Sequence, residues 1–562
     1  MEKKIDADVL VIGGGMAGCF AAIKAREKAK NTKRNLNVVL VNKGYVGRSG
    51  QTHRAACISV FNSEWGHKAE EWLEQFNTVG EYINNRIWNK IFLEESYSRF
   101  LDLLRWGVKF YEKNGEPVRG PNPHGSPNEF VFWGMDDRQH GLDRGLALRK
   151  AVEKSGAQII DRVMITDLIK NGDTIVGAVG VPLDTYDLYI FKAKAIVVCA
   201  GASGLKSAGW PNHDLTGDGE AIQYRVGAEI TGKEFNHTCF TSTQYPYYGT
   251  WPRPLTGRLH YEGLLRLVEN RKKCGSVFEF RDAEGKLIPI QGKGWMMNLE
   301  LEWAAHDGRG PLCVIQRAKE IVVGGAAVGM SHATAGAVPS DTTCAIRGLK
   351  GLYAAGDSLG AMHCGAHYSG FGFALAFAAV SGARAGVGAA EYALKAEKST
   401  FDEEELKRIK EIAQVPLKRK GGFNPRWVAS LIQHYMIPYY ILMIKSKERL
   451  EATLKLIEFV RDHLVPKLKA NNPHELRLVH ETKNMVLISE MMLRASLFRT
   501  ESRGFHYRED YPRRDDPTWL AWVMLKEESG RMKVSKEPIP KEWWPDLSKP
   551  YQERYPVRFP GE

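Results

Sequence analysis

A short apolar strand that runs directly into a glycine-rich turn constrains this chain more than any other feature. Residues 9–12 are Val-Leu-Val-Ile, Gly13, Gly15 and Gly18 follow, and residues 19–30 have the Ala/Lys-rich composition of a helix. In that order the first glycine permits a tight turn, the second lets the backbone approach a pyrophosphate, and the third lets helix and strand pack closely. The spacing predicts a parallel α/β fold that binds a dinucleotide at a helix N-terminus, with an ordinary Gly-rich turn as the alternative.

A second strand is predicted at residues 37–41. It ends in Asn42-Lys43, where dinucleotide-binding folds normally carry an acidic residue that binds the adenosine ribose. The side-chain carbonyl of Asn42 can still accept a hydrogen bond, so this departure weakens the fingerprint without removing it. The loop at 44–56 is rich in small and hydrogen-bonding residues, a composition that suits a flavin's ribityl chain and ring edge or, alternatively, a surface turn.

Later segments return to the same nucleotide site. A predicted strand ends in Ala200-Gly201, and Asp218 stands near the start of a helix, where it serves as a cap or as a ligand contact. Another strand, at residues 352–357, ends in Asp357. Between residues 233 and 338 the pattern loosens into Trp, Tyr, Pro and Gly, which predicts an inserted second domain.

Composition excludes several classes of protein. The 562 residues exceed one hydrophobic core, and the contents of 43% hydrophobic and 26% charged residues indicate a soluble multidomain protein. The net charge of +12 favours anionic partners, yet no basic run resembles a nucleic-acid arm. We expect neither a signal peptide nor a transmembrane span, and therefore a cytoplasmic protein, with docking to a membrane complex left open.

The cysteines argue against a metal centre held by this chain. All eight are isolated and none forms a C-x-x-C pair, whereas iron–sulfur clusters and structural zinc usually draw on closely spaced thiolates. We predict no metal ligands and interpret these residues as buried thiols.

Several motifs stand together in one order along most of the chain. In this order the chain resembles the flavoprotein subunits of the succinate dehydrogenase/fumarate reductase family, which includes L-aspartate oxidase and the adenylylsulfate reductase alpha subunit. The motifs are the 13–18 glycine loop, Lys43 with Arg48-Ser49-Gly50, Ala200-Gly201, Thr216-Gly217-Asp218-Gly219, Gly308-Arg309-Gly310-Pro311, residues 351–357 (GLYAAGD) and residues 501–512 (ESRGFHYREDYP).

The resemblance implies an architecture and a cofactor. It implies a Rossmann-like FAD-binding domain at 1–232 and 339–395, an inserted mobile capping domain at 233–338, a helical domain at 396–520 and an irregular tail at 521–562. The family's flavin-linked histidine position is Gly50 here, so we expect non-covalent FAD, although His53 leaves a covalent link open. The residues implied to bind FAD are Gly13, Gly15, Met16, Ala17, Gly18, Asn42, Lys43, Arg48, Ser49, Gly50, Gln51, Thr52, Ala200, Gly201, Thr216, Asp218, Gly356, Asp357, Ser369 and Gly370.

The substrate side departs from the dicarboxylate enzymes of the family. Those resemble one another in two arginines, one in a helix before the Gly-Arg-Gly motif and one in the final Gly-rich stretch. Here the first region reads Leu299-Glu300-Leu301-Glu302 and the second His367-Tyr368-Ser369-Gly370. Losing both guanidiniums removes the bidentate carboxylate recognition that arginine supplies best.

Those two arginines are also missing from adenylylsulfate reductase, whose alpha chain this sequence resembles most in motif detail. That resemblance places His332 where the family has a substrate-side histidine, which contacts substrate or moves a proton. A structural histidine in a turn is the alternative. Arg309 would orient an anionic substrate, or form a structural ion pair. Arg253 or Arg258 would supply a cation that the resemblance expects near Thr241, and His367 and Tyr368 would face the substrate.

The leading hypothesis is an adenylylsulfate-reductase-like subunit that exchanges two electrons between FAD and a small anionic substrate. Because the cysteines are not clustered, the electrons pass to or from a separate ferredoxin-like iron–sulfur subunit. The positive net charge also suits such a partner. The alternatives are a succinate dehydrogenase/fumarate reductase flavoprotein subunit, an L-aspartate-oxidase-like enzyme that releases peroxide, and a non-catalytic FAD-binding assembly subunit.

Overall fold

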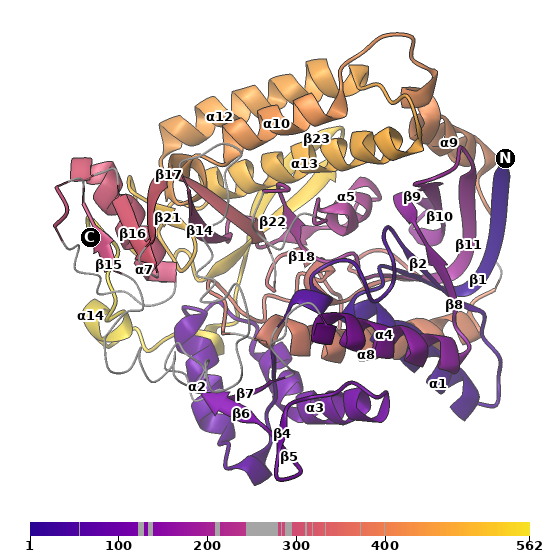
Figure 1. Cartoon of the computed structure of the whole chain (residues 1–562), viewed down its shortest axis with the longest axis horizontal. Helices are drawn as coiled ribbons and strands as arrows, with labels where there is room; N and C mark the ends of the chain where they lie inside the picture. Colours follow the sequence, from indigo (N-terminus) through magenta and orange to yellow (C-terminus); the bar gives the residue numbers. More distant parts are fainter. Residues whose placement is uncertain are drawn as a thin grey trace.

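The fold was analysed in a computed structural model of the chain (Figure 1). The structure describes residues 1–55, 57–121, 129–132, 139–207, 214–242, 279–282, 284–286, 295–309, 312–316, 319–331, 333–370, 372–397 and 400–562.

A seven-stranded sheet forms the centre of the nucleotide-binding region. Its order is β8-β2-β1-β11-β10-β9, with β19 paired to the end of β11. The strands β8, β2, β1, β11 and β19 run parallel, so their carboxyl ends meet at one edge. The bounds are β1 (Glu2–Ile12), β2 (Val38–Asn42), β8 (Gln158–Asp161), β9 (Val163–Asn171), β10 (Thr174–Pro182), β11 (Leu188–Val198) and β19 (Leu352–Ala354). The predicted parallel α/β fold is confirmed.

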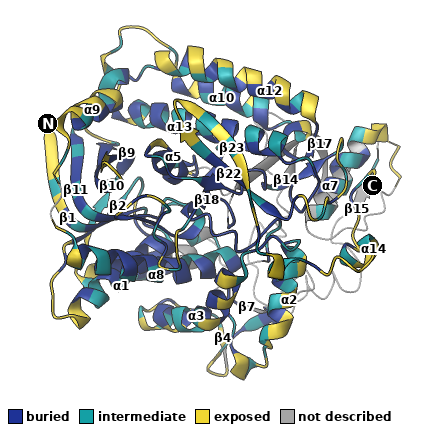
Figure 2. Ribbon diagram, turned by 180° about the vertical axis from the view of Figure 1, so that it is seen from behind, coloured by how far each residue is buried: buried dark blue, intermediate teal, exposed yellow. Residues whose placement is uncertain are grey.

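Two parallel helices pack on this sheet because small residues face each other. The helix α1 (Met16–Asn31) follows the glycine loop, and α8 (Phe373–Lys395) follows β19. A Cβ on Gly382 would fall 2.4 Å from the Ala17 carbonyl oxygen, and one on Gly386 would fall 2.3 Å from that of Ala21. Both helices lie below the sheet in Figure 1. By length and composition α8 could span a membrane, yet most of it is buried inside the protein, as its dark blue colour in Figure 2 shows.

Helices between β2 and β8 complete this side of the molecule. They are α2 (Ala69–Val79), α3 (Arg86–Arg105) and α4 (Gln139–Ser155), accompanied by the short strands β3 (Cys57–Ser59), β4 (Glu112–Lys113), β5 (Glu116–Pro117), β6 (Arg119–Pro121) and β7 (Glu129–Phe132). The helix α5 (Asp218–Arg225) follows the Thr216-Gly217 turn.

A second sheet lies within the range predicted as the capping domain, apart from its strand β12, which precedes that range. Its order is β12-β17-β16-β15, and β14 pairs with β17. The bounds are β12 (Ser203–Gly204), β14 (His237–Ser242), β15 (Glu279–Arg281), β16 (Leu312–Gln316) and β17 (Lys319–Ser331), with the helix α7 (Trp295–Ala304) and a wide turn at Ala305–Arg309. His237 stands opposite Met330, so the chain enters and leaves this sheet side by side.

The helical region carries four long helices, α9 (Glu403–Lys418), α10 (Pro425–Met436), α12 (Lys447–Phe459) and α13 (Pro473–Phe498). The short α11 (Tyr439–Leu442), β20 (Ile444–Lys445) and β21 (Tyr507–Arg508) connect them to the C-terminal motif. In Figure 2 the outer faces of α10 and α12 are exposed, whereas α13 is largely buried.

The C-terminal tail is more regular than predicted. From residue 521 the chain forms the hairpin β22 (Ala521–Glu528) and β23 (Arg531–Pro538), and β22 pairs with β13 (Ile230–Thr231). Ser529 and Gly530 both have positive φ, as a two-residue hairpin turn requires. The expectation of an irregular tail is therefore wrong for 521–538.

Candidate functional site

The glycine loop has the geometry that its sequence spacing predicts. Gly13 has φ +108°, and a Cβ there would fall 2.2 Å from the Cys199 carbonyl oxygen. A Cβ on Gly18 would fall 1.8 Å from the Gly13 carbonyl oxygen. No side chain fits at either position, so the turn follows β1 closely and α1 begins directly behind it with Gly15 as its N-cap residue. The free N–H groups of the first turn of α1 therefore lie at the carboxyl edge of the sheet.

Asn42 connects this loop to the next one. Its Oδ1 accepts from Gly14 N at 3.0 Å, and its Nδ2 donates to Ser49 Oγ at 3.0 Å. Thr52 Oγ1 accepts from Met16 N at 2.9 Å in the first turn of α1. The predicted cofactor residues 42, 49 and 52 thus converge on the glycine loop. Arg48, in contrast, is exposed, and Gln51 is half-buried.

Lys43, Thr216 and Asp218 form a polar cluster with the helical region. Lys43 Nζ lies 2.7 Å from Asp218 Oδ2 and 2.8 Å from Glu481 Oε1, and Thr216 Oγ1 donates to Asp218 Oδ1 at 2.7 Å. Although burial opposes ionisation, Lys43, Lys206 and Arg477 hold the pKa of Glu481 well below its usual range. These predicted cofactor residues therefore tie the nucleotide-binding region to α13.

The ends of β11 and β19 place a carboxylate at the same edge. Gly201 and Gly356 have positive φ, and Ser358 Oγ donates to the Gly201 carbonyl oxygen at 3.3 Å. Asp357 Oδ1 accepts from Ala333 N at 2.9 Å. Burial raises the pKa of Asp357 to about 6, and within the described residues no cation pairs with it. A half-buried carboxylate in this setting is a good acceptor for a sugar-alcohol hydroxyl.

The offset between α1 and α8 distinguishes the two ends of the site. Gly382, nine residues into α8, packs on Ala17, which is one residue into α1, so α8 begins about 12 Å beyond the start of α1. Across the sheet, Asn42 lies at the end of β2 and Asp357 follows β19 on the far side of β1. If the adenosine half of a dinucleotide lay at Asn42, its flavin half would lie toward Asp357 and the first turns of α8.

Four rings gather at that flavin end. Phe505 stacks on His237, with centroids 5.0 Å apart at 10°, and on His367, at 4.3 Å and 26°. Tyr368 lies 5.7 Å from His237. Thr334 Oγ1 donates to the Gly365 carbonyl oxygen at 2.9 Å, next to the Ala333–Asp357 bond, so this loop adjoins Asp357. We call these four residues, His237, His367, Tyr368 and Phe505, the ring cluster.

Sequence reasoning found half of the ring cluster. His367 and Tyr368 are predicted substrate-side residues, and the structure brings them together; Ser369 and Gly370 follow them directly. His237 and Phe505 were missed. Phe505 lies inside the 501–512 motif, which was the available signal, while nothing in the sequence distinguishes His237 from a structural histidine.

The remaining predicted residues do not join the cluster in the described structure. Arg309 ends the wide turn after α7, is exposed, and forms no hydrogen bond or ion pair with another described residue. His332, Arg253 and Arg258 lie outside the described residues.

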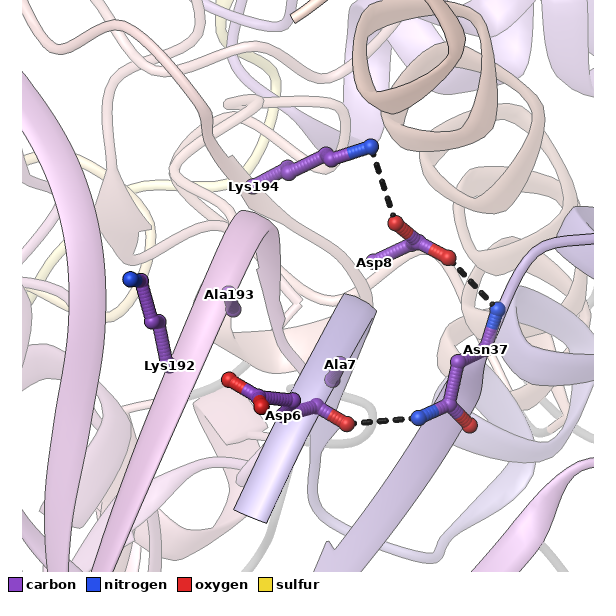
Figure 3. Close-up of a pocket in the computed structure, with 7 residues that line it drawn as sticks. All are labelled: Asp6, Ala7, Asp8, Asn37, Lys192, Ala193 and Lys194. Atoms are coloured by element: carbon purple, nitrogen blue, oxygen red, sulfur yellow. Dashed lines mark hydrogen bonds and ion pairs between the residues drawn. The ribbon is translucent and has the colours of Figure 1, made fainter. Parts of the chain in front are cut away.

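A small hollow at the opposite edge of the sheet is not part of this site (Figure 3). It lies beside the middle of β1 and β11, away from the glycine loop that follows Ile12. Asp8 accepts from Asn37 N at 2.8 Å and pairs with Lys194 Nζ at 3.0 Å, so the Asp8 carboxylate is satisfied within the protein.

Comparisons with known proteins agree with this geometry. The family model described as "FAD binding domain" matches residues 8–270, and the one described as "Fumarate reductase flavoprotein C-term" matches residues 432–555. Together they match well over half of the chain. The first contains the glycine loop, Asn42 and Asp218, and the second contains Glu481 and the 501–512 motif.

Several relatives that match along nearly their full length carry fumarate reductase names. A fumarate reductase (CoM/CoB) subunit from Methanothermobacter marburgensis is 27% identical, over 93% of this chain and 98% of its own. The structure of Mycobacterium smegmatis Sdh1 in complex with UQ1 has the same fold, with a TM-score of 0.80 at 21% identity, covering 98% of both chains.

The similarity to adenylylsulfate reductase is the more distant one. The alpha subunit from Megalodesulfovibrio gigas is 25% identical, over 54% of this chain and 49% of its own. The resemblance in motif detail therefore does not extend along the chain as the fumarate reductase match does. The chain belongs to the FAD-dependent flavoprotein family of fumarate reductase and succinate dehydrogenase.

Proposed function

We propose that this chain is the FAD-bearing subunit of an oxidoreductase that exchanges two electrons with an activated carbon–carbon bond of a small substrate, in the manner of fumarate reductase. The observation that carries the proposal is the match to a fumarate reductase subunit over 93% of the chain. Because of this match, adenylylsulfate, which the motif detail favoured as the substrate, becomes the second candidate.

The residues at the carboxyl edge fit FAD. The first turn of α1 faces the pyrophosphate, Asn42 faces the adenosine, and Asp357 accepts from a ribityl hydroxyl. Gly50 has positive φ with no atom within 4 Å of an added Cβ, so its surroundings leave room beside the ring. When bound, FAD supplies the two-electron chemistry of its ring, and the protein binds, orients and excludes water. FAD is held without a covalent bond, because Gly50 occupies the position of the family's flavin-linked histidine.

The substrate-side roles remain those that the family resemblance implies. His332 contacts the substrate or moves a proton, and Arg309 orients an anionic group. Reduction of a carbon–carbon double bond adds two electrons and two protons, so a proton-carrying side chain is needed beside the flavin. His237 and His367 add two imidazoles at the flavin end that can serve the same purpose.

A separate iron–sulfur protein carries the electrons to or from this subunit. The full-length relative is itself named as one subunit of an enzyme, and the isolated cysteines of this chain give no cluster ligands. The net charge of +12 suits an acidic partner. The rival hypothesis is an oxidase, which would release hydrogen peroxide with an amino acid and need no partner.

Anaerobic reoxidation of the dithionite-reduced holoprotein tests the proposal. Fumarate, 3-phenylacrylate and adenylylsulfate are added separately, and the return of the oxidised flavin spectrum is followed. Return with either unsaturated acid supports the proposal. Return with adenylylsulfate alone favours the second candidate, for which the partial match to the M. gigas alpha subunit speaks. No return with any of the three contradicts both.

A further inference from the structure

We propose that the substrate presents a flat, uncharged, π-bonded group to His237, His367 and Tyr368, and not a second carboxylate. This inference rests on the proposed function, because it names the class of substrate that the same site takes. It comes from the ring cluster and from the charges around it.

The ring cluster forms a surface of three half-buried rings, with the buried Phe505 packed behind two of them. Phe505 is buried and stacks on both His237 and His367, whereas those two and Tyr368 are only half-buried. Tyr368 Oη accepts from Ala374 N at 3.1 Å in the first turn of α8. Phe505 N donates to the Ala366 carbonyl oxygen at 2.9 Å, and a Cβ on Gly504 would fall 2.3 Å from that oxygen. The C-terminal motif therefore fixes Phe505 against the 365–370 loop.

The position of the cluster would put it beside the ring of a bound flavin. His367 and Tyr368 directly precede α8, whose first turns extend beyond the glycine loop on the Asp357 side. A substrate that reacts at the flavin must therefore lie against this cluster or against residues that face it. Aromatic and imidazole rings bind planar π-systems by offset stacking.

Among the described residues, the guanidiniums of Arg499 and Arg503 in and next to the C-terminal motif are both paired with carboxylates. Arg499 pairs with Glu234 at 2.9 Å and Glu501 at 2.8 Å. Arg503 pairs with Glu501 at 2.7 Å and Asp516 at 2.7 Å. Both arginines are buried, and so are Glu234 and Glu501. In the part of the chain that the structure describes, the C-terminal motif therefore offers no guanidinium there to clamp a substrate carboxylate.

Two members of the ring cluster, His367 and Tyr368, are held in their uncharged forms. Burial lowers the pKa of His367 and raises the pKa of Tyr368. A carboxylate placed against these rings would lose water without gaining a counter-ion from Arg499 or Arg503, which is costly. A planar uncharged group loses little there and gains ring contacts.

Two sources supply such a group, an aryl substituent on an unsaturated acid and the adenine of adenylylsulfate. Binding to the oxidised holoprotein separates them, with the flavin difference spectrum as the readout and 3-phenylacrylate, adenosine monophosphate and fumarate as probes. We expect 3-phenylacrylate or adenosine monophosphate to bind at least tenfold more tightly than fumarate. Equal or tighter binding of fumarate, or no binding of either planar probe, overturns the inference.

Two substitutions of Tyr368 test the contributions of its ring and of its hydroxyl group separately. Tyr368→Leu removes the ring, and we expect it to weaken the planar probe about five- to tenfold while fumarate binding and FAD content stay unchanged. Tyr368→Phe keeps the ring and retains probe binding within about twofold. Tyr440→Leu, at an exposed tyrosine of α11, is the matched control and changes nothing.

The readout also keeps this inference separate from the proposed function. Binding to oxidised flavin requires no electron transfer. If 3-phenylacrylate binds through Tyr368 and neither it nor fumarate reoxidises the reduced flavin, the proposed reaction is refuted and the inference stays intact. Fumarate that binds more tightly than the planar probes and reoxidises the flavin would refute the inference and support the proposed reaction. If Tyr368→Leu binds the planar probe as the wild type does, the cluster is not the substrate surface.

Discussion

Gly382 of α8 lies so close to Ala17 of α1 that a Cβ on Gly382 would fall 2.4 Å from the Ala17 carbonyl oxygen. Because the obstacle is backbone, Gly382→Ala must displace one helix, and the gain in helix propensity of about 1 kcal/mol does not compensate. We expect a loss of about 2 kcal/mol or more in unfolding free energy and weaker FAD binding. Gly421→Ala, where an added Cβ meets nothing within 4 Å, is the control. Equal thermal unfolding midpoints for the two variants would refute the close packing.

Asn42 holds the glycine loop through Gly14 N and the 44–52 loop through Ser49 Oγ. Asn42→Ala removes both hydrogen bonds, and at about 1 kcal/mol each we expect FAD to bind about tenfold or more weakly. Asn42→Asp keeps the acceptor for Gly14 N and loses only the bond to Ser49, so its loss is smaller. Fluorescence titration of the apoprotein with FAD measures both; an unchanged dissociation constant in Asn42→Ala would count against this role.

Asp357 makes the apoprotein sensitive to pH. Burial raises its pKa to about 6, above the ordinary value of 3.8. A carboxyl group whose pKa is higher in the folded state contributes stability at low pH, and this contribution disappears as the pH rises through 6. Relative to Asp357→Asn, which does not titrate, the wild-type apoprotein should lose about 3 kcal/mol between pH 4 and pH 7. Urea unfolding at each pH measures this, and a difference independent of pH would contradict it.

Glu481 is the shared carboxylate of Lys43, Lys206 and Arg477. Glu481→Gln leaves these cations without their partner in a buried setting, and we expect a loss of about 3 kcal/mol or more. Glu528→Gln, which breaks only the exposed pair with Lys533, should change stability by less than about 1 kcal/mol. Thermal unfolding compares the two variants.

The pH dependence of Glu481 is opposite to that of Asp357. Because the three cations hold the pKa of Glu481 below its ordinary value of 4.5, its contribution is present above pH 4.5 and declines as the pH falls further. The gap between the wild type and Glu481→Gln should therefore narrow in acid. A gap that widens below pH 4.5 would show that the cations do not depend on this carboxylate.

Local patterns in the sequence predicted the nucleotide-binding edge because each signal there is a short run with a fixed backbone requirement. Gly13 and Gly18 have no room for a side chain, and Asp357 follows a strand that the sequence marks clearly. The tail was predicted less well. Its hairpin turns at Ser529-Gly530, a pair that is typical of two-residue hairpin turns and is visible in the sequence.

Other features depend on contacts between distant segments, which periodicity does not report. Apolar residues recur at steps of three or four between residues 65 and 115, which predicts a helical stripe that faces the core. Trp72, Phe76 and Ile91 do lie in the core, yet Ile87 is 51% exposed. The reason is a break between α2 and α3, where Glu81 and Tyr82 have positive φ and the helical phase restarts. The ring cluster likewise joins residues 237, 367 and 505, which only the folded chain brings together.

The flavin content of the purified chain tests the central claim most directly. The account predicts one FAD per chain, released into the filtrate after denaturation, and little FAD in Gly15→Val, whose side chain would occupy the pyrophosphate position while the circular dichroism spectrum stays unchanged. FAD retained on the denatured protein would contradict non-covalent binding. A wild-type chain that neither contains FAD nor takes it up, or a Gly15→Val chain that binds FAD normally, would contradict the assignment of this edge as the cofactor site.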